Sequence, residues 1–182
     1  WVAVAVIFAF LITIINLMGA KTAAILQTIL TVAIGAAGIA LVVASLFTGT
    51  PSNLDGQVFN GSSTGSIFSN IVRVAAVSPF FFIGFDVIPQ AAEEINVPLK
   101  KIGKMLLLSI ILAISFYALV IFAVGYVMDS KAIVTSYADS GLVTADAMAK
   151  AFHSEAMSKV IIIAGMCGII TSWNSFMLGG SR

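Results

Sequence analysis

Long runs of apolar residues, separated by short polar stretches, dominate the chain. An apolar run of about 20 residues spans the hydrocarbon core of a bilayer as a helix. Five runs fit this length, at about residues 1–17, 22–47, 67–92, 102–128 and 160–180. They lack the alternation of apolar and polar positions that membrane β-strands show. The pattern predicts an all-α, polytopic transmembrane helix bundle, with residues 1–182 in a single transmembrane domain.

Composition supports this interpretation. Apolar residues make up 60% of the chain and charged residues 9%, whereas an average soluble domain is about 25% charged. Soluble globular and disordered classes are therefore excluded. The net charge of +1 gives no basic footprint for nucleic acid. Cys167 and His153 stand alone, and no catalytic or phosphate-binding motif occurs, so we expect no enzyme, cofactor or metal site.

The connections between the runs indicate an orientation, because basic residues concentrate in cytoplasmic loops. Bases stand in alternate connections: Lys21; Lys100, Lys101 and Lys104; and Arg182. The loop at residues 48–66 has one acid and no base, and the loop at residues 129–159 is mixed. We therefore expect the Lys100–Lys104 loop to be cytoplasmic. In the outer loops, Asn60 begins a glycosylation sequon in form, and Thr144 is expected to cap a short helix at residues 145–152.

The third run contains features that oppose a regular helix. Pro79 removes a backbone N–H, Gly84 leaves helical angles at low cost, and Asp86 places a carboxyl group in the membrane. Together they predict two half-helices joined by an unwound stretch at residues 83–85. The alternative is a plain proline kink. Unwound backbone at this depth offers carbonyl and N–H groups to a solute, as in secondary transporters.

Asp86 has two interpretations that do not exclude each other. One is the N-cap of the second half-helix, and the other is a proton-binding carboxyl group in the translocation path. Burial would raise its pKa and helix N–H groups would lower it, so the sequence leaves both interpretations open.

Polar side chains also gather near the end of the last run, at Thr171, Ser172, Asn174 and Ser175. Thr171 and Ser175 are four positions apart and share a helix face. Their hydroxyl groups are expected to coordinate Na⁺, to form a hydrogen-bond network in its place, or only to join helices. In the second run, small residues between Ala33 and Ala40 predict a close packing face.

Three segments resemble the amino acid–polyamine–organocation (APC) permeases. "PFFFIGFDVIPQAAEEINVPLKKIGK" at residues 79–104 is similar to their sixth helix and the following cytoplasmic loop. "NLMGAKTAAILQTILT" at residues 16–31 and "TSWNSFMLGGSR" at residues 171–182 resemble parts of the fourth, fifth and eighth helices. The resemblance implies a fragment covering about helices four to eight of a 5+5 inverted-repeat, leucine-transporter-type fold, with a discontinuous third helix here.

The resemblance also implies a substrate site. The backbone of Phe82, Ile83 and Gly84 would bind the α-amino group of the substrate. Phe80 or Phe81 would close over it from outside, and Phe85 would pack beside its side chain. Some proton-coupled members carry a lysine midway along the second run, and this chain has none there.

We therefore expect a secondary active transporter of amino acids or related amines in the plasma membrane, working by alternating access. Coupling to a proton or Na⁺, or exchange, would drive it. The alternatives are a structural membrane subunit that does not transport, which predicts that Asp86 is replaceable without functional loss, and a channel, which requires polar residues lining several spans.

Overall fold

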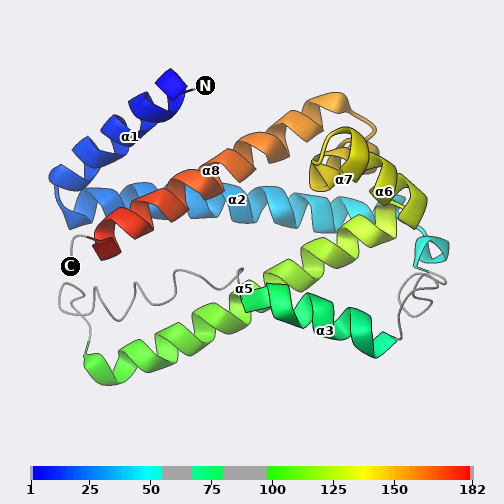
Figure 1. Ribbon diagram of the computed structural model, residues 1–182, viewed down its shortest axis with the longest axis horizontal. Helices are drawn as coiled ribbons and strands as arrows, with labels where there is room; N and C mark the ends of the chain where they lie inside the picture. Colours follow the sequence, from blue (N-terminus) through cyan, green and yellow to red (C-terminus); the bar gives the residue numbers. More distant parts are fainter. Residues whose placement is uncertain (1, 55–66, 80–97, 181–182) are drawn as a thin grey trace. The chain divides into compact units, whose positions relative to one another are not determined.

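The computed structural model of the chain describes residues 2–54, 67–79 and 98–180. This part is helical, and no strand occurs within it, which confirms the predicted all-α class (Figure 1). The elements in chain order are α1 (Val2–Leu17), α2 (Ala20–Thr48), the 3₁₀ helix η1 (Pro51–Asn53), α3 (Ile67–Val77), α5 (Leu99–Val127), α6 (Ser130–Asp139), α7 (Val143–Phe152) and α8 (Glu155–Gly180).

Within the described residues, three helices are long and apolar enough to cross a membrane, judged by length and composition. Their spanning portions are Lys21–Thr48, Lys100–Val127 and Glu155–Met177, and α1 and α3 are shorter apolar helices. In α3 the α-helix ends at Val77 and is followed by 3₁₀ geometry at residues 78–79. The expected break at residues 83–85 lies outside the described residues, as does Asn60. The break and the division into five spans stay predictions.

A glycine turn joins α1 to α2. Gly19 has φ +107°, a left-handed conformation that glycine adopts without the steric cost of a Cβ atom. Its N–H donates to the carbonyl of Asn16 at 3.1 Å, and its own carbonyl accepts from the N–H of Ala23 at 3.2 Å. The turn therefore ends one helix and begins the next within a few residues.

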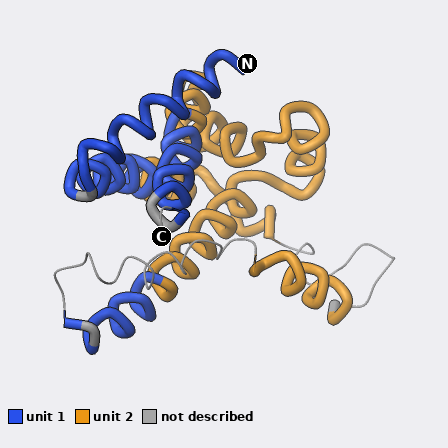
Figure 2. The backbone as a smooth tube through the Cα atoms, turned by 60° about the vertical axis from the view of Figure 1, so that its left-hand side comes forward, with its two compact units in different colours: residues 1–36, 84–109, 163–182 blue, residues 37–83, 110–162 orange. Residues whose placement is uncertain are grey.

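The chain divides into two compact units (Figure 2). Unit 1 comprises Trp1–Ala36, Gly84–Ser109 and Ile163–Arg182, and unit 2 comprises Ala37–Ile83 and Ile110–Ile162. Unit 1 contains α1 and the end portions of α2, α5 and α8. Unit 2 contains the rest of these three helices together with α3, α6 and α7.

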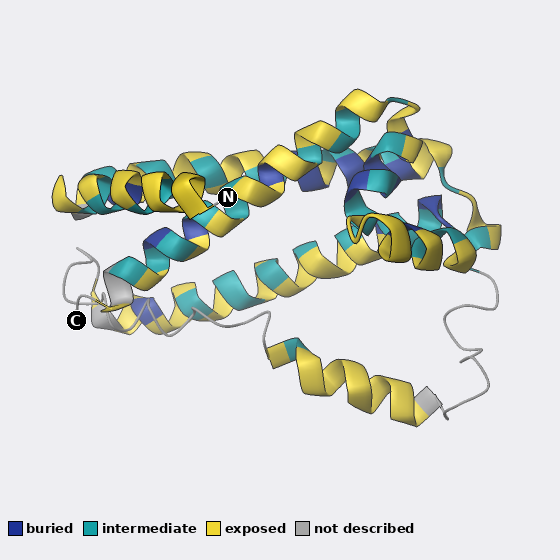
Figure 3. Ribbon diagram, turned by 45° about the horizontal axis from the view of Figure 1, so that its top comes forward, coloured by how far each residue is buried: buried dark blue, intermediate teal, exposed yellow. Residues whose placement is uncertain are grey.

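Unit 2 has an apolar core built from small and flexible side chains, drawn dark blue in Figure 3. The core consists of Leu41, Ala123, Val127, Met128, Ala147, Met148 and Ala151. Gly38 of α2 faces the ring of Phe116 of α5, and a Cβ atom built there would lie 2.7 Å from Cε2 of that ring. A Cβ atom at Gly35 would have no atom within 4 Å. The predicted packing face of small residues is therefore close-packed at Gly38 and open at Gly35.

The segment after α5 holds two short helices. Asp129 caps α6, because its side chain accepts from the N–H of Ala132 at 3.1 Å. The sequence pattern did not predict this helix. It predicted the next one, α7, but the assigned cap was wrong: α7 begins at Val143 after the N-cap Leu142, and Thr144 lies within its first turn. Ser136 and Ser140 of α6 both donate to Oδ2 of Asp146, which joins the two helices.

His153 ends α7 in a left-handed conformation, with φ +51°. A side chain in this region costs about 1–2 kcal/mol relative to glycine. We therefore expect His153→Gly to stabilise the protein by about 1 kcal/mol and to raise its apparent melting temperature in detergent. His153→Ala keeps the Cβ atom and is the matched control. An equal gain from both variants would contradict backbone strain as the cause.

Candidate functional site: a buried amide network

Asn174 of α8 lies at the centre of a polar network in unit 1. Its side chain is buried, with 5% exposed. Its Oδ1 accepts from Nδ2 of Asn16 in α1 at 2.8 Å, and its Nδ2 donates to Oε1 of Gln27 in α2 at 3.0 Å. A longer contact of 3.5 Å joins Nδ2 to the carbonyl of Ala23. One amide side chain therefore connects three helices.

The network has a fixed direction. Nδ2 of Asn16 also donates to the carbonyl of Ile12 at 2.9 Å, so Asn16 must present its NH₂ group to Asn174. Asn174 then accepts on the side of α1 and donates on the side of α2. Gln27 accepts from Asn174, and its Nε2 donates to Oγ of Ser175 at 3.1 Å. Reversing any one amide group would bring two donors or two acceptors together.

The hydroxyl groups singled out in the sequence lie in different surroundings. Ser175 belongs to the network through its contact with Gln27. Thr171 is buried, but its hydroxyl donates to the carbonyl of Gly168 in its own helix at 2.8 Å. Ser172 is exposed. The structure therefore places one of the three in the network, and their role as an ion site or network stays a prediction.

The chemistry of the network is that of neutral amide and hydroxyl groups. None of its members titrates in the physiological range, so the network positions helices and does not transfer protons by itself. Within the described part of the chain, no group of three or more His, Cys, Asp or Glu side chains is placed to hold a metal ion.

Sequence reasoning missed two members of this network. Asn16 and Gln27 entered only as part of the segment at residues 16–31 that carries the family resemblance. The usable signal was the amide itself, because a primary amide in a membrane helix requires partners on a neighbouring helix. Each of the three helices of the network carries one such amide, at Asn16, Gln27 and Asn174.

Phe80, Phe81, Phe82, Ile83, Gly84, Phe85 and Asp86 lie outside the described residues, and their roles stay predictions.

Unit 2 has a second polar region at the junction of α7 and α8. A hollow of about 550 Å³ is lined there by Asp146, Ala149, Lys150, His153, Ser154 and Glu155. It is open to the surroundings, and the carboxylate of Asp146 is already engaged by Ser136 and Ser140. We therefore assign Asp146 to holding α6 against α7.

Long apolar helices joined by neutral hydrogen bonds define an integral, multi-pass helical membrane protein. The family model described as "Amino acid permease" matches residues 1–182. The chain belongs to the amino acid permease family. Membership of this family indicates an amino acid transporter and not an enzyme. The searches of curated proteins and of solved structures found no significant match.

Proposed function

We propose that the chain is part of a secondary active transporter that moves amino acids or related amines by alternating access. A proton or ion gradient, or exchange, provides the energy. The observation that carries this proposal is the family match over residues 1–182. We assign the protein to the plasma membrane and the end of α5 that holds Lys100, Lys101 and Lys104 to the cytoplasm, because the basic residues alternate between connections.

In this proposal the substrate binds at residues 80–85 and Asp86 serves coupling. The support is the sequence itself: Pro79, Gly84 and Asp86 stand within eight positions of an apolar run, a pattern typical of discontinuous transporter helices. Unwound carbonyl groups there bind the ammonium group of the substrate, and the N-terminus of the second half-helix binds its carboxylate.

We further propose that Ser175, near the end of α8, acts in a hydrogen-bond network and not as a Na⁺ ligand. Its contact with Gln27 supports this choice, because the hydroxyl oxygen of Ser175 accepts from Nε2 of Gln27. An ion would have to compete with this hydrogen bond for the same oxygen.

Uptake of a panel of labelled amino acids by the full-length protein in liposomes tests the proposal. We expect saturable uptake of a subset of the panel, and a change in rate when the proton or Na⁺ gradient is imposed or removed. Asp86→Asn is expected to lower this uptake. Asp139→Asn, which changes an exposed acid at the end of α6, is the matched control and should leave uptake unchanged.

Two results would contradict transport by alternating access, and a third would contradict the role of Asp86 alone. Absence of uptake for the whole panel, with protein that is folded by gel filtration, would favour a structural subunit. Uptake that rises without saturation would favour a channel. Equal uptake by Asp86→Asn and the original protein would remove Asp86 from coupling while leaving transport intact.

A further inference from the structure

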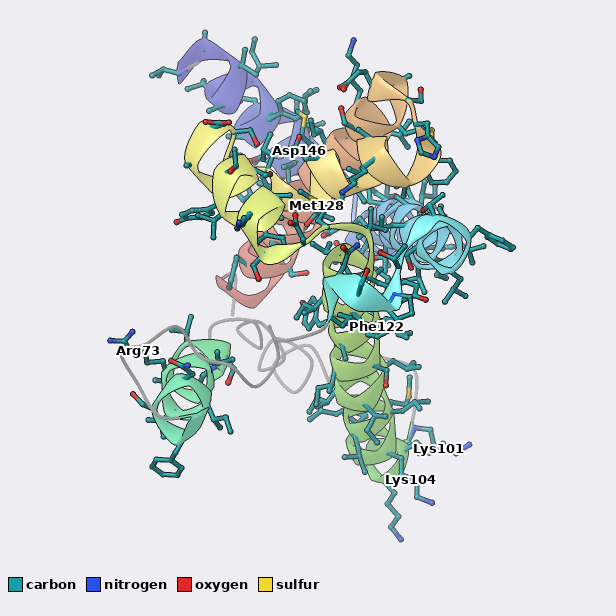
Figure 4. All side chains as sticks on the ribbon, turned by 90° about the vertical axis from the view of Figure 1, so that its right-hand side faces the viewer. Arg73, Lys101, Lys104, Phe122, Met128 and Asp146 are labelled. Carbon is teal, nitrogen blue, oxygen red and sulfur yellow. The ribbon has the colours of Figure 1, made fainter. Side chains whose placement is uncertain are left out.

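Three lysine residues occupy the first six positions of α5, at Lys100, Lys101 and Lys104. All three are exposed, and Figure 4 shows the side chains of Lys101 and Lys104 extending outward from the end of this helix. The first turn of α5 holds no acidic residue. The N-terminus of a helix carries partial positive charge and repels cations, so the lysines gain nothing from their own helix. Within the described part of the chain, this arrangement leaves the charge of the three lysines available to an anion.

The lysines lie at the end of an exposed apolar stripe. Lys101, Met105, Leu108 and Leu112 follow one another at the spacing of a single helix face. The three apolar side chains are 51%, 57% and 60% exposed. Ile102, one position away, is 9% exposed and belongs to the packed side of the helix. Hence the cations and the apolar stripe share the unpacked face.

Gly103 leaves room beside the lysines. It stands between Lys100 and Leu107 along the helix, and a Cβ atom built there would have no atom within 4 Å. Leu107 is 60% exposed. The space beside Gly103 therefore lies between the cation of Lys100 and the apolar side chain of Leu107.

We propose that Lys100, Lys101 and Lys104 bind the phosphate of an anionic phospholipid whose acyl chains lie along Met105, Leu108 and Leu112. The order of charge and apolar surface along α5 matches the order of headgroup and chain in a lipid. The helix is long and apolar enough to cross a membrane, which puts its first turn at headgroup depth. Anionic lipids are abundant in the cytoplasmic leaflet, in agreement with the orientation proposed above.

The test measures lipid retained by the full-length protein in detergent, by native mass spectrometry, after exposure to phosphatidylcholine alone or mixed with phosphatidylglycerol. Each lysine near an anionic surface contributes about 1 kcal/mol, so neutralising all three should lower phosphatidylglycerol binding on the order of a hundredfold. The variant is Lys100→Gln with Lys101→Gln and Lys104→Gln. The matched control neutralises Lys131, Lys150 and Lys159 and should retain the lipid.

Several results would overturn the lipid site. They are equal loss of lipid in the control, equal retention of phosphatidylcholine by the original protein, and displacement of the lipid by inorganic phosphate alone, which would indicate a site for free phosphate. Gly103→Leu is a second test, because it fills the space beside the lysines without changing the charge. It should also reduce the retention of phosphatidylglycerol. None of these readings depends on uptake, so failure of the lipid site is distinguishable from failure of the transport proposal.

Discussion

Replacing Asn174 by leucine is expected to destabilise the protein by about 1–3 kcal/mol, because the half-buried amide groups of Asn16 and Gln27 each lose a hydrogen-bond partner. Without this amide, Nδ2 of Asn16 loses one of its two acceptors, and Oε1 of Gln27 loses its donor. A hydrogen bond between membrane helices contributes only about 0.6 kcal/mol on average, so most of the effect comes from the groups left unpaired. The measurement is the apparent melting temperature of the purified protein in detergent, followed by gel filtration of heated samples. Ser172→Leu, at an exposed position of the same helix, is the control and should have little effect.

The direction of the network sharpens this test. Asn174→Asp keeps the acceptor for Asn16 but removes the donor to Gln27 and to the carbonyl of Ala23. Gln27→Glu keeps the acceptor for Asn174, and the hydroxyl of Ser175 can rotate to donate to the second carboxylate oxygen. Both changes introduce an acid, so the pair controls for charge. We expect Asn174→Asp to be clearly more harmful. Equal destabilisation would show that the network has no fixed direction.

The fold could be predicted well where the apolar pattern is long. The runs at residues 22–47, 102–128 and 160–180 coincide with α2, α5 and α8 to within a few residues at each end, because nearly uniform apolar composition leaves helix as the structure that bonds its own backbone in lipid. The segment at residues 129–159 was harder. The carboxylate of Asp129 at the N-cap position was a usable signal for α6. The helix itself is short and mixed in polarity, so its apolar pattern gave no further support. At α7 the wrong cap followed from preferring a hydroxyl over Leu142.

The site could be predicted only in part, for a geometric reason. Thr171, Ser172 and Ser175 are close in sequence, so the pattern grouped them, but Ser172 is exposed and the hydroxyl of Thr171 donates to the carbonyl of Gly168 in its own helix. Asn16 and Gln27 are more than 140 residues from Asn174. The local pattern of one helix does not predict which amide of another helix will bind to its own amide. The requirement that a buried amide find partners identifies the candidates, and only the packing identifies the pairs.

Within each of the two units, the helices are held together by a different kind of contact. Apolar surface gives little drive to associate in lipid, so helices are held by close van der Waals packing and by polar contacts. Unit 1 uses the amide network around Asn174. Unit 2 relies more on small residues that allow close approach, as at Gly38 and in the alanine-rich α7. A bulky residue should therefore be tolerated poorly at Gly38.

We expect Gly38→Leu to destabilise the protein by about 3 kcal/mol, at the upper end of the usual cost of overpacking. The new side chain would overlap the ring of Phe116, whose Cε2 lies 2.7 Å from the position of a Cβ atom. Relief would require α2 and α5 to separate and would open the core around Leu41 and Ala123. The apparent melting temperature in detergent measures the effect.

Gly35 provides the matched control on the same helix, since a Cβ atom there meets nothing within 4 Å. Gly35→Leu should leave stability unchanged or raise it, because leucine forms helix more readily than glycine by up to about 1 kcal/mol. A double variant tests the cause directly. If overlap with the ring is responsible, Gly38→Ala should cost less in a Phe116→Leu background than in the original protein, which gives a positive coupling between the two positions. Equal costs in the two backgrounds would show that the glycine serves its own helix and not the contact with α5.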